Sequence, residues 1–157
     1  MERIVVARSK KQVSSAKGLI LDYAASLGVD LSFQGFDREM AEFPSGFVAP
    51  DGRLLIAVED GEAVGVVGVR KLSRTICELK RMYVRPESRG KGIGRMLAER
   101  AVRDARDLGY SRMRLDTLAR LEEAVRLYES MGFKRIQPYT FNPTEGVLFM
   151  ELDLRNS

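Results

Sequence analysis

The chain alternates between segments with a helical spacing of apolar residues and short runs of β-branched or apolar residues. Four segments are predicted to be helices, the longer ones because apolar residues recur three and four positions apart: 9–27, 36–43, 93–108 and 121–131. Seven short apolar runs, bounded by glycine, proline or polar turns, are predicted to be strands: 3–8, 53–60, 62–72, 75–84, 111–118, 132–136 and 146–154.

The order of these elements predicts the fold class. Asp60 and Gly61 separate two strand segments and suit a tight hairpin turn, which makes the two strands antiparallel. A strand, helix and strand between about residues 76 and 117 form a unit that should be parallel and right-handed. We therefore expect an α/β fold with a mixed, mostly antiparallel central sheet flanked by helices, in one domain over residues 1–157.

Composition narrows the possible chemistry. The chain has 45% apolar and 31% charged residues, as in an ordinary globular protein, no histidine and one cysteine. Imidazole-based triads, histidine-ligated zinc and intramolecular disulfides are excluded, and no metal site is expected. Cys77 lies in a strand segment and is expected to be an inert core thiol rather than an acyl carrier. No apolar run approaches the roughly 18 residues that span a bilayer, so we expect a cytoplasmic protein with no membrane partner.

Positive charge is concentrated at one place. The formal net charge is +4, and between Lys80 and Arg95 six basic residues accompany a single acid, Glu87. Elsewhere the two signs are mixed, as on a solvated helix face. The basic strip has no interleaved aromatic residues on a regular surface, so nucleic acid is not the expected partner. An anionic small molecule is favoured instead.

The basic strip contains the glycine-rich segment "RGKGIG", residues 89–94, between a predicted strand and a predicted helix. Glycines at such a junction let unpaired backbone N–H groups approach a phosphate. The segment matches neither the mononucleotide GxxxxGK[ST] motif nor the dinucleotide GxGxxG/A motif. The alternative is a solvated basic turn, which does not account for three clustered glycines.

Two motifs resemble the GNAT superfamily of acyl-CoA-dependent N-acyltransferases. Arg89, Gly92 and Gly94 occupy the fixed positions of its Arg/Gln-x-x-Gly-x-Gly/Ala signature, and "AVRLYESMGFKRI", residues 124–136, resembles its later helix motif. The resemblance implies a sheet that is splayed at the acyl-CoA site, acetyl-CoA as co-substrate and a small-molecule or peptide amine as acceptor, in a monomer or homodimer. It places the cofactor on Met82, Tyr83, Val84, Arg89, Gly90, Lys91, Gly92, Ile93, Gly94 and Arg95.

Transfer of an acetyl group to an amine needs a proton acceptor, a stabilised oxyanion and a proton donor for the departing thiolate. Glu78 is the candidate base because it interrupts an apolar strand; the alternative is an ion pair with Lys80 or an arginine. Tyr128 occupies the family's tyrosine position, from which it would protonate the thiolate; the alternative is an ordinary core tyrosine. A backbone N–H near Met82 or Tyr83 would hold the oxyanion.

The acceptor side is less defined. The family often has Asn where this chain has Leu121, so that contact is not carried over, and Thr117 or another group would replace it as a helix cap. We expect the acceptor pocket to include Phe33, Gln34, Phe36 and Tyr139, from two irregular segments. The identity of the amine stays open, and the alternative function is a non-catalytic acyl-CoA binding or sensing domain.

Overall fold

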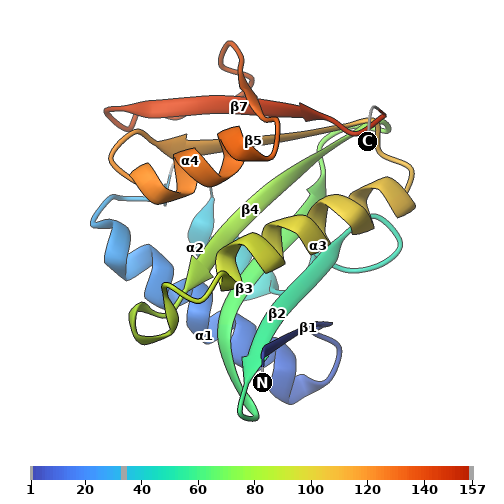
Figure 1. The fold of residues 1–157 in the computed structure, drawn as a ribbon, viewed down its shortest axis with the longest axis vertical. Helices are drawn as coiled ribbons and strands as arrows, with labels where there is room; N and C mark the ends of the chain where they lie inside the picture. The colour runs from blue at the N-terminus through green and yellow to red at the C-terminus, as the bar shows by residue number, and fades with distance from the viewer. Residues whose placement is uncertain (1, 33–34, 156–157) are drawn as a thin grey trace.

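The computed structural model describes residues 2–32 and 35–155 and has a seven-stranded mixed sheet as its central layer (Figure 1). The strands run in the spatial order β1-β2-β3-β4-β5-β7-β6, and every neighbouring pair is antiparallel except β4 with β5. The strands are β1 Glu2–Val6, β2 Arg53–Glu59, β3 Glu62–Lys71, β4 Ile76–Val84, β5 Arg112–Leu118, β6 Lys134–Arg135 and β7 Val147–Asp153. The helices are α1 Lys10–Leu27, α2 Phe36–Glu42, α3 Ile93–Asp107 and α4 Glu122–Ser130, with a 3₁₀ turn, η2, at Pro86–Ser88.

The predicted α/β fold and its element order are confirmed. Asp60 and Gly61 both have positive φ, 52° and 83°, as a two-residue turn between antiparallel strands requires. Helix α1 begins after Ser9 because the Ser9 hydroxyl accepts the Gln12 N–H at 3.1 Å and the Gln12 side chain accepts the Ser9 N–H. The sixth strand is shorter than predicted, since only Lys134 and Arg135 pair with β7.

The helices cover both faces of the sheet (Figure 1). On β2, Leu55 and Ala57 pack in one core with α3, whereas Leu54 and Ile56 pack in a second core with α1. This alternation follows from the two-residue period of a strand. Helix α4 packs in the same core as α3 through Ala124, Leu127 and Tyr128. Within residues 2–32 and 35–155, none of the helices combines the length and apolarity needed to cross a bilayer.

Strands β4 and β5 pair over only three residues and then separate. Ile76, Cys77 and Glu78 lie opposite residues 112–114, after which β4 continues along β3 and β5 continues along β7. A β-bulge adds to the separation, because the β3–β4 register shifts between Lys80 and Tyr83 and Arg81 takes a φ of 61°. The sheet is therefore splayed between β4 and β5, as the sequence resemblance implied.

Candidate active site

Two cavities meet in the gap between β4 and β5. The larger has a volume of about 640 Å³ and is lined by the end of β4, the glycine-rich loop, and the N-terminal parts of α3 and α4. The smaller has a volume of about 80 Å³ and is lined by the end of α1, the following loop, β4, β5 and residues 142 and 144. Met82, Leu121, Ala124 and Tyr128 line both cavities. A ligand in one cavity can therefore touch a ligand in the other at these four residues.

The larger cavity has an open helix terminus at its wall. Gly92 is the N-cap of α3 with a φ of 80°, and no side chain among the described residues caps this helix. A Cβ built on Gly90 or Gly92 would meet no atom within 4 Å, so these glycines leave free space beside the backbone. The first N–H groups of α3 lack intrahelical acceptors and carry the positive end of the helix dipole. This wall suits a phosphate or pyrophosphate group.

The basic side chains near this wall make contacts within the chain. Arg89 Nε donates to the Val84 carbonyl at 2.9 Å, and Arg95 Nη2 donates to Ser130 Oγ at 2.8 Å. Both arginines line the cavity. Lys91 does not, and its Nζ lies 2.8 Å from Glu59 Oε2. Nine of the ten residues predicted to hold the cofactor line this one cavity, and Lys91 is the exception.

Tyr128 lies at the junction of the two cavities. The residue is only 5% exposed, and its ring meets Phe133 edge-on with 5.6 Å between ring centres. Burial raises the pKa of Tyr128 above the ordinary phenol value, and the phenol of Tyr23 adds to the increase. A neutral phenol at this junction is able to donate its proton.

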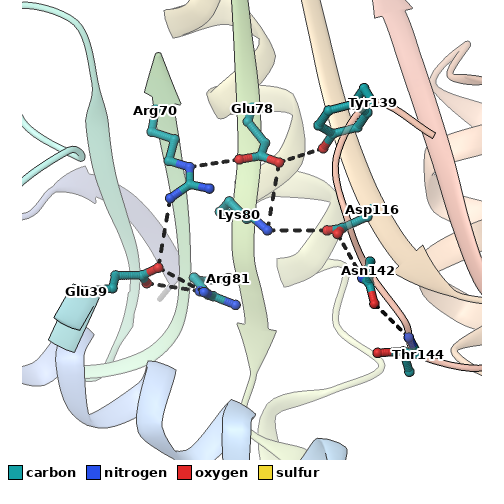
Figure 2. Close-up of polar contacts among 9 residues, drawn as sticks. All are labelled: Glu39, Arg70, Glu78, Lys80, Arg81, Asp116, Tyr139, Asn142 and Thr144. Carbon is teal, nitrogen blue, oxygen red and sulfur yellow. Dashed lines mark hydrogen bonds and ion pairs between the residues drawn. The ribbon is translucent and has the colours of Figure 1, made fainter. Parts of the chain in front are cut away.

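Glu78 is held by other residues of the chain rather than exposed to a cavity (Figure 2). Its Oε1 accepts from Arg70 Nε at 2.8 Å, and its Oε2 accepts from the Tyr139 hydroxyl at 2.6 Å. Lys80 Nζ lies 3.8 Å from the same Oε2. Glu78 lines neither cavity. These contacts favour the ion-pair alternative, and the role of Glu78 as base stays a prediction.

The carboxylate that does line the smaller cavity is Asp116 of β5. Its Oδ1 lies 3.4 Å from Lys80 Nζ, and its Oδ2 accepts from Asn142 Nδ2 at 3.0 Å. The Asn142 side chain in turn accepts the Thr144 N–H at 3.0 Å. Asp116 stands in a strand segment whose alternation gave no sign of a functional carboxylate. Asn142 lies three residues after Tyr139, in one of the irregular segments expected to form the acceptor wall, and its contact with β5 is a finding of the structure.

On the other side of β4, the bulge is tied to α2 (Figure 2). Arg81 Nε and Nη2 bind the two carboxylate oxygens of Glu39 at 3.0 and 2.8 Å, and Arg70 Nη1 lies 4.0 Å from Glu39 Oε1. A bidentate pair of this kind fixes the arginine geometry. The side chain of the bulged residue Arg81 is thereby held in place.

The four residues predicted to form the acceptor wall are placed as follows. Phe33 and Gln34 lie outside the described residues. Phe36 packs under Arg81, whose guanidinium carbon is 5.0 Å from the ring centre, and Tyr139 binds Glu78. Neither lines a cavity; Tyr23, Asn142 and Thr144 do so instead. Tyr23 shares the apolar spacing of α1, which is why its helix pattern indicated only a core residue.

Two further expectations concern single residues. Helix α4 begins after Leu121 and has no side-chain cap, so the expected replacement cap from Thr117 or another group is not found. Glu122 and Glu123 in its first turn interact favourably with the helix dipole instead. Cys77 is fully buried, and burial raises the pKa of its thiol to about 12. A thiol with this pKa is a poor nucleophile.

Comparison with known proteins identifies the class. Residues 21–133 match the model of the Acetyltransferase (GNAT) family. An uncharacterized N-acetyltransferase of Schizosaccharomyces pombe is 40% identical over 153 residues, which is 96% of this chain and 94% of that protein. The chain therefore belongs to the GNAT acetyltransferase family.

Solved structures agree with this assignment at the level of the fold. A GNAT-family acetyltransferase from Staphylococcus aureus Mu50 superposes with a TM-score of 0.80 at 18% identity, over 98% of this chain and 99% of that one. The yncA acetyltransferase from Salmonella typhimurium, solved with its cofactor acetyl-CoA, superposes with a TM-score of 0.70 at 22% identity, over 99% and 95% of the two chains.

Proposed function

We propose that this chain is an N-acetyltransferase that transfers acetyl from acetyl-CoA directly to a primary amine, in one catalytic domain. The observation that carries the proposal is the meeting of two cavities at Tyr128, Met82, Leu121 and Ala124. The larger cavity takes the cofactor and the smaller takes the amine. The acetyl-CoA bound to the structurally similar yncA protein supports the choice of cofactor.

Three features of this chain support binding of the cofactor in the larger cavity. The open N-terminus of α3 and the space beside Gly90 and Gly92 suit the pyrophosphate. The end of β4, Met82 to Val84, forms the adjoining wall, where an extended pantetheine arm would lie along the strand. Arg89 and Arg95 add positive charge at the same wall. Acetyl-CoA supplies the thioester, and the residues of the chain bind and orient it.

The reaction forms one N–C bond and breaks one C–S bond. An ammonium acceptor loses two protons in total. One proton ends on the sulfur of coenzyme A, giving the free thiol, and the other goes to solvent. We propose that Tyr128 donates the proton to sulfur and that Asp116, which lines the amine cavity, accepts the proton of the ammonium group. Backbone N–H groups at the bulge around Met82 would stabilise the oxyanion, since bulged residues lie outside the ladder.

The experiment measures binding and turnover separately. Calorimetry should show binding of acetyl-CoA, with no binding of ATP, NAD or duplex DNA at the same concentrations. Release of free thiol from acetyl-CoA is then followed with a panel of primary amines, and at least one amine should accelerate it well above hydrolysis. Binding of acetyl-CoA without acceleration by any amine would instead support a non-catalytic acyl-CoA sensor.

A further inference from the structure

Three charged residues line the smaller cavity: Lys80, Asp116 and Arg81, whose guanidinium binds Glu39. Lys80 is 5% exposed. The acceptors that the described residues offer to Lys80 Nζ are Asp116 Oδ1 at 3.4 Å and Glu78 Oε2 at 3.8 Å. Bonds between an ammonium and a carboxylate are usually about 2.7–2.9 Å, and an ammonium has three donors. Lys80 therefore has donor capacity left for a ligand in the cavity.

The ion-pair network that contains Lys80 and Asp116 has no net formal charge. Three carboxylates and three basic groups form the connected network in Figure 2: Glu39, Glu78 and Asp116, with Arg70, Lys80 and Arg81. A buried net charge is costly, so the network favours an acceptor that adds none. A zwitterion meets this condition. A polyamine or another polycation does not, because it needs an excess of carboxylates.

Another part of the cavity lining is apolar. Side chains from the end of α1, the loop after it, the end of β5 and the start of α4 form this part: Leu27, Val29, Leu31, Leu118 and Leu121. Leu27, Leu31 and Leu118 also pack on one another as a small core cluster. A cavity of about 80 Å³ with both charged and aliphatic lining suits a small ligand with one charged end and one aliphatic end.

We infer that the acceptor is a free amino acid with a small aliphatic side chain, whose carboxylate is bound by Lys80. Its ammonium group would face Asp116, and its side chain the leucine-rich part of the lining. Lys80 is then the residue that determines specificity for a carboxylate. The inference rests on the proposed N-acetyltransferase function and adds the class of substrate to it.

The test compares three acceptors that differ only at the carboxylate. L-Valine carries it, L-valinamide replaces it with a neutral amide, and isobutylamine lacks it. We expect kcat/KM for L-valine to exceed the values for the other two by roughly 10- to 100-fold, since a site built to bind a polar group rejects analogues without it. The amine of L-valinamide is less basic than the amine of L-valine, so L-valinamide has the larger fraction of neutral amine. A preference for L-valine over L-valinamide therefore does not reflect the amount of neutral amine.

The variant Lys80→Met should remove this preference, mainly by raising KM for L-valine, while the affinity for acetyl-CoA measured by calorimetry stays the same. The matched control is Lys71→Met, the same change at an exposed lysine of the neighbouring strand β3, which should keep the preference. Should Lys80→Met fail to fold, the acceptor comparison on the unmodified protein still decides the inference.

The outcomes separate this inference from the proposed function. Equal turnover of isobutylamine and L-valine would overturn the amino-acid assignment and leave the N-acetyltransferase function standing. Retained preference in a folded Lys80→Met protein would overturn the role of Lys80. Acetyl-CoA binding without turnover of any amine would overturn both proposals.

Discussion

The two cavities that meet at Tyr128 are built in different ways. The larger has one wall, here called the backbone site, formed by a strand end, two glycines with positive φ and the first turn of α3 within residues 82–95, and a second wall formed by residues 120–128 at the start of α4. The smaller is lined by side chains from α1, β4, β5 and the segment before β7, which are far apart in the chain. A backbone site tolerates exchange of most side chains, whereas a side-chain site changes with each substitution. The first arrangement suits a cofactor shared by a family, and the second suits an acceptor particular to one member.

The largest expected effect comes from a change to the backbone site. In Gly92→Val a β-branched residue must adopt a φ of 80° and place its side chain in the space beside the α3 terminus. We expect acetyl-CoA affinity to fall roughly 1,000-fold, from strain and lost N–H contacts. Calorimetry measures it. The matched control is Gly109→Val, at a φ of 95° beyond the other end of α3, which should lower stability and leave affinity intact.

Equal loss of affinity in both glycine variants would show that the effect of Gly92→Val is general destabilisation. The backbone assignment of the cofactor site would then be wrong.

The next effect concerns the junction of the two cavities. Tyr128→Phe keeps the ring that packs on Phe133 and removes only the hydroxyl. We expect kcat to fall roughly 100-fold, as for the loss of a general acid, with acetyl-CoA affinity changed less than about twofold. Steady-state thiol release and calorimetry measure the two quantities. Unchanged kcat would leave Tyr128 as an ordinary core tyrosine.

A pair of variants separates the two carboxylates of the side-chain site. Asp116→Asn should lower kcat on the order of 10- to 100-fold, because the proton acceptor that lines the cavity is lost. Glu78→Gln should lower the free energy of unfolding by about 3 kcal/mol, since it removes the charge of the buried carboxylate that joins Arg70 and Lys80, and change kcat less. Urea unfolding and thiol release measure both. The reverse result, with the rate lost only in Glu78→Gln, would support Glu78 as the base.

The same contrast explains what the sequence alone predicts. Glycines, charge and periodicity within about 15 residues define the backbone site, so nine of its predicted residues line one cavity. The helix and strand order follows from local spacing, and the structure confirms it. The exception, Lys91, shows the limit of the local argument, because its partner Glu59 comes from β2.

The side-chain site depends on contacts that no local pattern encodes. Asp116 and Lys80 are 36 positions apart, and Tyr139 and Glu78 are 61 apart. A polar residue inside an apolar strand pattern indicates that its side chain has a hydrogen-bond or ion-pair partner, but the pattern does not identify that partner. Glu78 is unusual for this reason, and the sequence predicts Lys80 or an arginine as an ion-pair partner. Which arginine it is, Arg70, and the contact with Tyr139 follow only from the three-dimensional arrangement.

A smaller effect is expected from the Tyr139 hydroxyl. Tyr139→Phe removes the 2.6 Å bond to Glu78 and should cost about 2 kcal/mol in the free energy of unfolding, as for a hydrogen bond to a charged group. Because this bond positions the segment that carries Asn142, KM for the acceptor should rise a few-fold. Tyr110→Phe is the matched control: it removes a 2.6 Å bond to the neutral Asp51 carbonyl, away from both cavities. The KM of Tyr110→Phe for the acceptor should not change. Equal KM values in the two variants would contradict a positioning role for Tyr139.

The smallest effect is a dependence of stability on high pH. Burial, and then the charge of Glu78, raises the pKa of Tyr139 above the ordinary phenol value of about 10. Above that pH the phenol ionises in the unfolded chain but stays protonated in the folded one, so the unfolded state binds fewer protons and the free energy of unfolding falls as pH rises. Tyr139→Phe should make this fall shallower by at most about 1.4 kcal/mol per pH unit. Urea unfolding of both proteins at pH 8.5, 9.5 and 10.5 measures the slope of the free energy of unfolding against pH. The contributions of other titrating groups cancel in the difference between the two slopes. Equal slopes would mean that Tyr139 ionises as readily in the folded protein as in the unfolded one.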